Sequence, residues 1–363
     1  MVLWAMSFGC TQWVQGSQAP PSILTFYGAS DASAAVALND PWFVVADDEN
    51  NILRVYDRQK PGLPVLTYDL SDYVQTDPDS PETDIEGATR VGNRIYWITS
   101  HSRNKDGKMR PSRYRFFALD FVLQPDSVSF TPVGKPCTTL IQQLLADPAV
   151  RPLGLDSATR LDDNLSKKER EKLAPKEQGL NIEALAASPD SKTLYIGFRN
   201  PRPAHPVSGR PMAIMIPLAN PDAILLRDDP ARFEPPLLWD LKGLGIRGME
   251  FSPILKSFFI IPGHPDSKSS FELYHWSGDR ATPPKSNLAI RVPNDFSPET
   301  VFPFGDGEIW LLSDDGPLPV RVNTAGDGSG DIINGCCENK LLSDPAKKFF
   351  RAIPLKLESF LLN

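Results

Sequence analysis

The stretch "TDIEGATRVGNRIYWITS", Thr83 to Ser100, decides the fold because its pattern recurs along the chain. Two carboxylates, Asp84 and Glu86, open a short alternating segment, which is followed by a Gly-Asn turn and an apolar run. A turn of this chemistry between two β-rich runs is typical of a β-hairpin. One copy carries little information, so the argument depends on whether the same order occurs elsewhere.

The same order of acid, strand, turn and strand occurs four more times. Each copy opens with an acid, continues into a small or apolar run, and turns into a second β-rich run. The other copies are SDASAAVALNDPWFVVADD from Ser30, NIEALAASPDSKTLYIGF from Asn181, GMEFSPILKSFFIIPG from Gly248 and SPETVFPFGDGEIWLLSD from Ser297. The acids in the equivalent position are Asp31, Glu86, Glu183, Glu250 and Glu299.

Each copy also has further strand candidates after its hairpin. The third strands would be ILRVYD, YRFFALDF, AIMIPLAN, FELYHW and LPVRVN, and a fourth run leads into the next copy. Four antiparallel strands repeated in a fixed order indicate a β-propeller. We therefore predict an all-β propeller that forms a single domain over residues 23–363. Five repeats are counted, but ILTFYG (23–28) and FFRAIPLKL (349–357) both have the form of a closing outer strand, so six blades stay open.

Two segments depart from the repeat. Residues 136–178 have helical composition and capping-type starts, and we predict a small helical insertion there that either shapes a binding mouth or only decorates the ring. Residues 1–22 form a leader that begins apolar without a basic region, with Gly9 before Cys10. This leader is either disordered or the remnant of an export or lipoprotein signal. Export would place the protein in the periplasm or outside the cell, and the cytoplasm is the alternative.

Composition excludes several classes of protein. The chain has 363 residues and a formal net charge of −7, which argues against a nucleic-acid groove or an anionic membrane surface. No run approaches the roughly 18 apolar residues of a membrane span. The 36 prolines fit the many loops and edge strands of an all-β protein. The four cysteines have no C-x-x-C spacing, so a zinc site of that kind is not expected.

Several motifs together resemble a known family. The segments are SDASAAVALNDPWFVVADDENNILRVYD, DIEGATRVGNRIYWITSHSRNKDGK, GLNIEALAASPD, FRNPR, GIRGMEF and SDDG. They resemble a bacterial domain family of unknown function that is related to the phytase-like and esterase-like propellers, and the resemblance covers residues 23–357. It implies a propeller fold but no established activity. In phytase-like propellers, calcium ions at the channel hold phosphate. This sequence departs from that pattern because it has no evident cluster of basic residues beside the acids.

The repeated acids predict a carboxylate ring. The innermost strands of a propeller all start at the same end of a central channel. We therefore expect convergence of Asp31, Asp84, Glu86, Glu183, Glu250 and Glu299. Crowded carboxylates repel one another, so something must offset their charge. A hard divalent cation, Ca²⁺ or Mg²⁺, is one possibility. Arginines, or backbone amides that donate hydrogen bonds to the acids, are the others.

Other polar residues complete the set of candidates. Arg199, Arg247 and Asn181 are the candidate ligand-binding residues. Catalytic candidates are Glu86, Glu183 and His101, of which the histidine follows Ser100 in a loop. A serine and a histidine adjacent in sequence do not by themselves form a nucleophile–base pair. His205 and His264 follow second strands and are expected to be ordinary loop residues, and the acidic turn Asp47, Asp48 and Glu49 is expected to be solvated. The fourth histidine, His275, lies in the third-strand candidate FELYHW.

Two functional classes follow from these observations. The first is a propeller, expected to be monomeric, that binds a divalent cation and a small ligand or protein partner. The alternative is a metal-dependent hydrolase of ester or phosphoester substrates that uses the channel carboxylates. The convergent acids favour the second class, and the absence of a recognisable nucleophile motif favours the first.

Overall fold

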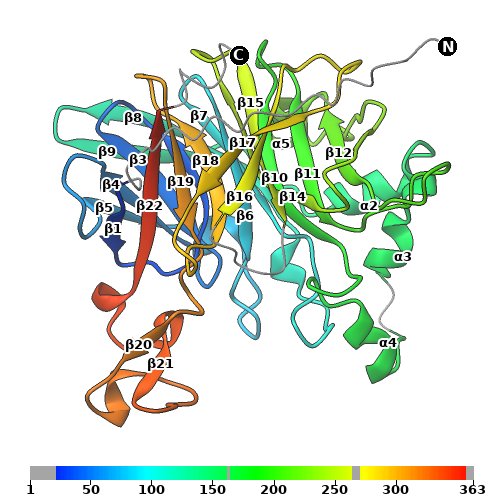
Figure 1. The fold of residues 1–363 in the computed structure, drawn as a ribbon. Coiled ribbons are helices and arrows are strands. Elements are labelled where there is room, and N and C mark those ends of the chain that lie inside the picture. The colour runs from blue at the N-terminus through cyan, green and yellow to red at the C-terminus, as the bar shows by residue number, and fades with distance from the viewer. Residues whose placement is uncertain (1–21, 162–163, 264–269, 357–363) are drawn as a thin grey trace, which may run out of the picture.

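The computed structural model describes residues 22–161, 164–263 and 270–356, and Figure 1 shows its ribbon. Nearly all of the predicted leader, including Cys10, lies outside the described residues, and so does His264. Among the described cysteines, Cys137, Cys336 and Cys337 are free thiols. None of the described helices is both long and apolar enough to cross a membrane.

Five four-stranded antiparallel sheets form the blades of one propeller, which confirms the predicted fold and the count of five. Blade 1 contains β2 (Ala32–Ala37), β3 (Trp42–Asp47), β4 (Ile52–Asp57) and β5 (Leu66–Asp69). Blade 2 contains β6 (Ile85–Val91), β7 (Arg94–Thr99), β8 (Phe116–Gln124) and β9 (Ser127–Pro132). Blade 3 contains β10 (Asn181–Ala187), β11 (Leu194–Asn200), β12 (Ala213–Leu218) and β13 (Leu237–Trp239). Blade 4 contains β14 (Gly245–Ser252), β15 (Ser257–Gly263), β16 (Ser270–Trp276) and β17 (Lys285–Arg291).

Blade 5 combines both ends of the described chain and closes the ring. It contains β18 (Pro298–Pro303), β19 (Glu308–Ser313), β22 (Phe349–Lys356) and, as its outermost strand, β1 (Leu24–Tyr27). Both candidates for the closing strand are therefore used, one as the third strand and one as the fourth. The prediction that LPVRVN is the third strand is wrong. Within it, β20 (Pro319–Arg321) pairs with β21 (Cys336–Glu338) in a separate hairpin.

The hydrophobic core lies between successive blades. Each of the five buried clusters joins side chains of two neighbouring blades, as expected when each sheet buries both faces. At the closure, Phe26 of β1 stacks on Phe350 with ring centroids 5.4 Å apart, and Phe43 of blade 1 meets Phe26 edge-on at 5.2 Å. The N-terminal strand is thus fixed by aromatic packing as well as by pairing with β22.

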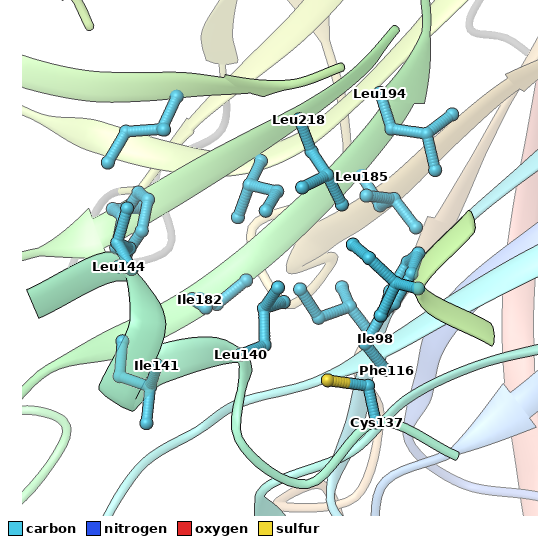
Figure 2. Packing of buried hydrophobic residues seen from close by; sticks show 14 of the residues in the cluster. Ile98, Phe116, Cys137, Leu140, Ile141, Leu144, Ile182, Leu185, Leu194 and Leu218 are labelled. Atoms are coloured by element: carbon cyan, nitrogen blue, oxygen red, sulfur yellow. The ribbon is translucent and has the colours of Figure 1, made fainter. Parts of the chain in front are cut away.

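The predicted helical insertion contains α2 (Leu140–Ala146), α3 (Leu155–Thr159) and α4 (Lys167–Lys172), and two short helices lie elsewhere, α1 (Ser71–Val74) and α5 (Pro221–Arg227). Figure 2 shows Leu140, Ile141 and Leu144 of α2 packed in the same cluster as Ile98 and Ile182 of blades 2 and 3. The insertion is therefore part of the core and not a detachable appendage.

The insertion and the β20–β21 hairpin belong to the same side of the ring. In Figure 1, α3, α4 and the β20–β21 hairpin all project from the lower side of the propeller. The insertion follows β9, the fourth strand of blade 2, and the hairpin follows β19, the second strand of blade 5. The second and fourth strands of a blade both run back to the end at which the innermost strand begins, so the innermost strands begin on this side. The term "mouth" below means this end of the central channel.

Candidate functional site

A β-bulge lies near the start of every innermost strand. At each bulge one residue has no partner on the second strand: Ser33, Glu86, Glu183, Arg247 and Glu299. Bulges re-aim a side chain and are common beside functional sites. Each of these five residues is buried, and each occupies the equivalent position in its blade.

This register corrects the predicted carboxylate ring. Arg247, and not Glu250, holds the position in blade 4, and Ser33, and not Asp31, holds it in blade 1. The repeats were compared by the position of their acids, which gave the wrong equivalent residue in blades 1 and 4 because residue types do not reveal a bulge. Glu250 lies three residues further along its strand, where its Oε1 accepts hydrogen bonds from Thr89 Oγ1 at 3.2 Å and from the Phe251 amide at 2.8 Å. Asp31 lies two residues before the bulge, still at the mouth.

Two arginines neutralise the carboxylates of blades 3 and 5. A guanidinium nitrogen of Arg247 lies 3.0 Å from Glu299 Oε1 and 3.3 Å from Asp314 Oδ2, and its Nε lies 4.0 Å from Glu183 Oε2. Arg199 donates to Glu183 Oε1 at 2.7 Å. Burial raises the pKa of Glu299 to about 7, although Arg247 opposes that rise. In this half of the mouth, formed by blades 3 and 5, arginines therefore provide the counter-charges, which was one of the predicted alternatives.

The other half of the mouth, formed by blades 1 and 2, is richer in acids. Asp48 follows β3, Asp84 precedes β6, and Glu86 lies at the bulge of β6. One carboxylate oxygen from each lies within 4.8 Å of the others. A second group with the same spacing contains Asp31, Asp48 and Glu49, so Asp48 belongs to both.

The first of these groups contains acceptors that no protein donor satisfies. Asp48 Oδ1 and Glu86 Oε2 are buried and have no hydrogen-bond partner. Glu86 is only 8% exposed. Burial raises the pKa of Glu86 well above its usual range, and the charges of Asp84, Glu183 and Glu299 raise it further. Burial also raises the pKa of Asp48, with added repulsion from Asp31 and Glu86.

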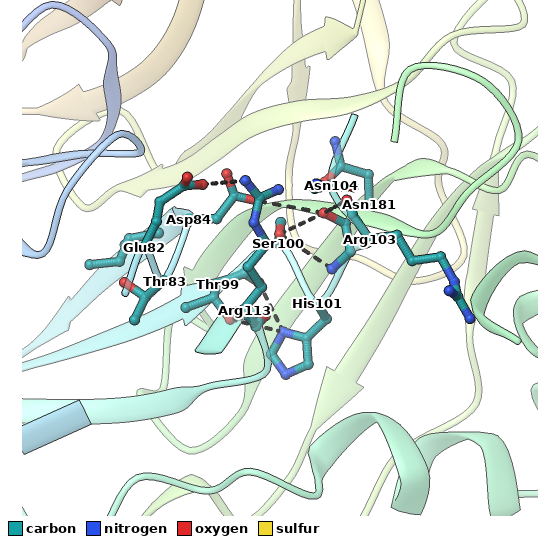
Figure 3. Close-up of polar contacts among 12 residues, drawn as sticks. Glu82, Thr83, Asp84, Thr99, Ser100, His101, Arg103, Asn104, Arg113 and Asn181 are labelled. Carbon is teal, nitrogen blue, oxygen red and sulfur yellow. Dashed lines mark hydrogen bonds and ion pairs between the residues drawn. The ribbon is translucent and has the colours of Figure 1, made fainter. Parts of the chain in front are cut away.

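Asp84 is held by both its backbone and its side chain. Its φ of +58° lies in the left-handed region, which aspartate tolerates better than most residues, and its carbonyl accepts the Ser100 amide at 2.8 Å. Arg113 forms an ion pair with Asp84 Oδ2 at 2.8 Å and also contacts Glu82, as Figure 3 shows. Burial nevertheless raises the pKa of Asp84, and Arg113 opposes this rise.

Asn181 adjoins the carboxylate of Glu183. The Asn181 Nδ2 group donates to Glu183 Oε1 at 2.7 Å, and the same oxygen accepts the hydrogen bond from Arg199. Asn181 Oδ1 and Glu183 Oε2 are buried without a hydrogen-bond partner. The three candidate ligand-binding residues, Arg199, Arg247 and Asn181, thus gather around one carboxylate.

His101, the catalytic candidate, lies apart from the acids. Its imidazole is buried, its Nδ1 lies 2.9 Å from the Thr99 carbonyl oxygen, and its ring packs edge-on against Tyr114. Figure 3 shows the ring on the far side of Arg113 from the Asp84 carboxylate. Burial lowers the pKa of His101 to about 4, so the ring is neutral at pH 7. Of the three catalytic candidates, Glu86 and Glu183 lie at the mouth.

A cavity extends from the mouth into the channel, with an empty volume of about 230 Å³ that is continuous with solvent. Its polar lining includes Ser33, Glu86, Glu183, Glu299 and Thr300. Small or apolar side chains of the same innermost strands form the rest: Ala35, Ala88, Leu185, Met249 and Val301.

Sequence reasoning missed three residues of the mouth. Asp48 was interpreted as part of an acidic turn in solvent, and Arg113 and Asp314 were not considered. A usable signal existed for Asp48 and Asp314: each closely follows the second strand of its blade, which returns the chain to the mouth. No such signal existed for Arg113, because its approach to Asp84 depends on the irregular loop before β8.

Comparisons with known proteins give a family match over part of the chain and several structures of low similarity. Residues 31–115 match a family model described as "Protein of unknown function (DUF3616)". No curated protein matches the sequence. Similar solved structures include a Myxococcus xanthus glutaminyl cyclase, with 12% identity, a TM-score of 0.39, and coverage of 81% of this chain and 93% of that one.

Two further similar structures are sugar dehydrogenases by name. A putative oxidoreductase (glucose dehydrogenase) from Thermus thermophilus has 12% identity and a TM-score of 0.40, covering 92% of this chain and 100% of that one. The PQQ-bound aldose sugar dehydrogenase from Streptomyces coelicolor has 14% identity and a TM-score of 0.37, covering 93% and 100%. Similarity at this level says nothing about the activity of this chain.

Proposed function

We propose that this protein is a Ca²⁺-binding β-propeller whose cation joins blades 1 and 2 at the mouth of the channel. The observation that carries the proposal is the buried Glu86 Oε2, which has no hydrogen-bond partner and belongs to a residue grouped with Asp48 and Asp84. An unsatisfied buried carboxylate oxygen is costly unless a cation or a donor occupies the space before it.

Electrostatics supports a cation more than an empty site. Two ionised carboxylates 4.8 Å apart repel by about 3 kcal/mol at an effective dielectric constant of about 20. Among the described ion pairs, Arg113 contacts Asp84 and Glu82, whereas Asp48 and Glu86 have no basic partner. A divalent cation would offset the repulsion of all three acids at once.

Donor chemistry favours Ca²⁺ or Mg²⁺ over softer metals. All three residues offer carboxylate oxygens, and neither acidic group includes a histidine or cysteine. Ca²⁺ takes six to eight oxygen ligands in flexible geometry, so three carboxylates leave positions for water or for a ligand's oxygen atoms. Asp48 is half-buried and Glu49 is exposed. The coordination positions left for water or a ligand would therefore face the open mouth.

A thermal melt tests the proposal. Wild-type protein treated with EDTA should melt a few degrees higher after Ca²⁺ is added, because a ligand at 100 times its Kd stabilises the folded state by about 2.7 kcal/mol. The Asp48→Asn variant should melt higher than the wild type in EDTA, because one repulsive charge is gone, and should lose the Ca²⁺ response. Glu183→Gln, outside both acidic groups, should keep it. An unchanged wild-type melt in Ca²⁺ would sink the proposal.

The hydrolase alternative has less support. Glu86 has a raised pKa, as a general acid or base would, but burial beside other carboxylates is enough to raise it without any catalytic role. Among the described residues, His101 is turned away from the acids and is not placed to assist Glu86. Turnover of an ester or phosphoester that falls in both Asp48→Asn and Glu86→Gln would favour this alternative.

A further inference from the structure

The central cavity differs in character from the proposed cation site. Glu183 lines it and takes no part in either acidic group of blades 1 and 2. The Glu183 residue is only 3% exposed, and its Oε2 has no hydrogen-bond partner. Glu86, on the innermost strand of the neighbouring blade, lines the same cavity, but its unpartnered Oε2 is the atom assigned above to the cation. We infer that the cavity is a second site, which binds a small primary alkylammonium group.

Hydrogen bonding sets the chemistry of the occupant. The unpartnered atoms are carboxylate oxygens, which accept hydrogen bonds when ionised and cannot satisfy one another. The occupant must therefore bring donors. A primary ammonium brings three N–H donors and no acceptor, whereas a quaternary ammonium brings none.

Charge points the same way. Three carboxylates, Glu86, Glu183 and Glu299, line the cavity. Two arginines bind them: Arg199 contacts Glu183, and Arg247 contacts Glu299 and lies 4.0 Å from Glu183 Oε2, too far for a hydrogen bond. Arg247 also contacts Asp314, so the acids around the cavity outnumber the two arginines and the occupant should be cationic. A polyphosphate or another anionic ligand would be repelled here.

The apolar lining sets the size of the occupant. Ala35, Ala88, Leu185, Met249 and Val301 offer small or apolar surface beyond the carboxylates along the strands. A short alkyl group would lie against this surface while its ammonium stays beside Glu183. The site would therefore take a methyl- or ethylammonium group, alone or as the end of a longer amine.

The inferred site can be tested on the full chain with simple probes. Methylammonium, ethylammonium and tetramethylammonium chlorides would be titrated at constant ionic strength, with sodium chloride as the reference salt and no amine in the buffer. The readouts are the melting temperature and the heat of binding, each with EDTA and with Ca²⁺. The two primary amines should give a saturable response, and tetramethylammonium should match sodium.

Variants separate this site from the proposed Ca²⁺ site. Glu183→Gln should weaken methylammonium binding by about tenfold or more, since a charge-assisted hydrogen bond is lost, and should keep the Ca²⁺ response. Asp48→Asn should do the reverse. Ala88→Val fills the apolar lining without changing charge and should block ethylammonium more than methylammonium. Glu250→Gln removes a channel carboxylate that does not line the cavity and serves as the matched control.

Several results would overturn the inference. They are the absence of a saturable response to either primary amine in the wild type, an equal response to tetramethylammonium, or an equal loss in Glu183→Gln and Glu250→Gln. If Glu183→Gln fails to fold, the comparison of amines in the wild type and the Ala88→Val variant decides the matter. Loss of the Ca²⁺ response alone, with amine binding intact, would overturn the proposed function and leave this inference standing.

Discussion

Glu250 is a buried carboxyl whose charge the structure does not compensate. The contacts it accepts come from neutral donors, the Thr89 hydroxyl and the Phe251 amide. Burial raises its pKa from 4.5 to about 8, and the two hydrogen bonds oppose this rise only in part. We predict that Glu250→Gln stabilises the protein at pH 8, because glutamine can accept the same two hydrogen bonds without the cost of a buried charge.

The sign and size of the effect follow from linkage. In the unfolded chain Glu250 loses its proton near pH 4.5, whereas in the folded protein it keeps the proton until about pH 8. The unfolded state therefore binds fewer protons in this interval, and stability falls as pH rises through it. The upper bound is about 5 kcal/mol, from a shift of about 3.5 units at about 1.4 kcal/mol each. We expect at least about 2 kcal/mol, since the protein relaxes around a buried charge.

The assay is urea denaturation of wild type and variant at several pH values from 4 to 8.5, in EDTA. Glu250→Gln should be more stable at pH 8, and its advantage should shrink toward zero near pH 4.5. Glu171→Gln, at an exposed position on α4, is the matched control. A variant that is less stable than the wild type at pH 8, or a difference independent of pH, would refute the assignment of an uncompensated carboxyl.

Two other perturbations test the closure and the mouth. Phe26→Ala should cost about 3–5 kcal/mol in the free energy of unfolding, because Phe26 is fully buried against Phe43 and Phe350; a cost below about 1 kcal/mol in a urea melt would mean that β1 does not close the ring. Gly316→Ala should lower the melting temperature, by overpacking of about 1–3 kcal/mol, because a Cβ there would lie 1.9 Å from Asp31 Oδ1; an unchanged melt would show that the Asp31 carboxylate moves freely.

The sequence predicted the blades because their signals are local. Alternating β-rich runs and turns with glycine, asparagine or serine-proline recur in one order, and they were sufficient for the count of five. The third strand of blade 5 was misplaced because β22 follows a long excursion after β19, and a short apolar run, LPVRVN, stood where a third strand was expected. Strand pairing across such an excursion depends on tertiary packing, here the buried Phe350 and Ala352.

The candidate site was predicted less completely than the fold. Convergence of Asp84, Glu86, Glu183 and Glu299 at one end follows from strand direction alone. The bulge that moves Arg247 into the ring and Glu250 out of it depends on hydrogen-bond register, which residue types do not specify. Asp48 was missed because an acid in a turn usually faces solvent. It belongs to an acidic group only because blade 2 brings Asp84 and Glu86 close to it.

The two halves of the mouth differ in how the charges of their carboxylates are compensated. Arg199 and Arg247 serve the carboxylates of blades 3 and 5, while Asp48 and Glu86 keep buried oxygens without donors. Arginines therefore compensate the carboxylates in one half of the mouth, and the proposed divalent cation would compensate those in the other half. Sequence reasoning presented these two as alternatives for the whole ring.

The most direct measurement of the central claim is an anomalous difference map from crystals grown with Mn²⁺ in place of Ca²⁺. We expect a peak bounded by carboxylate oxygens of Asp48, Asp84 and Glu86 in the wild type, and no such peak in crystals of Asp48→Asn. A map without a peak at this position in the wild type, or with its peak between Glu183 and Glu299 instead, would contradict the proposed cation site.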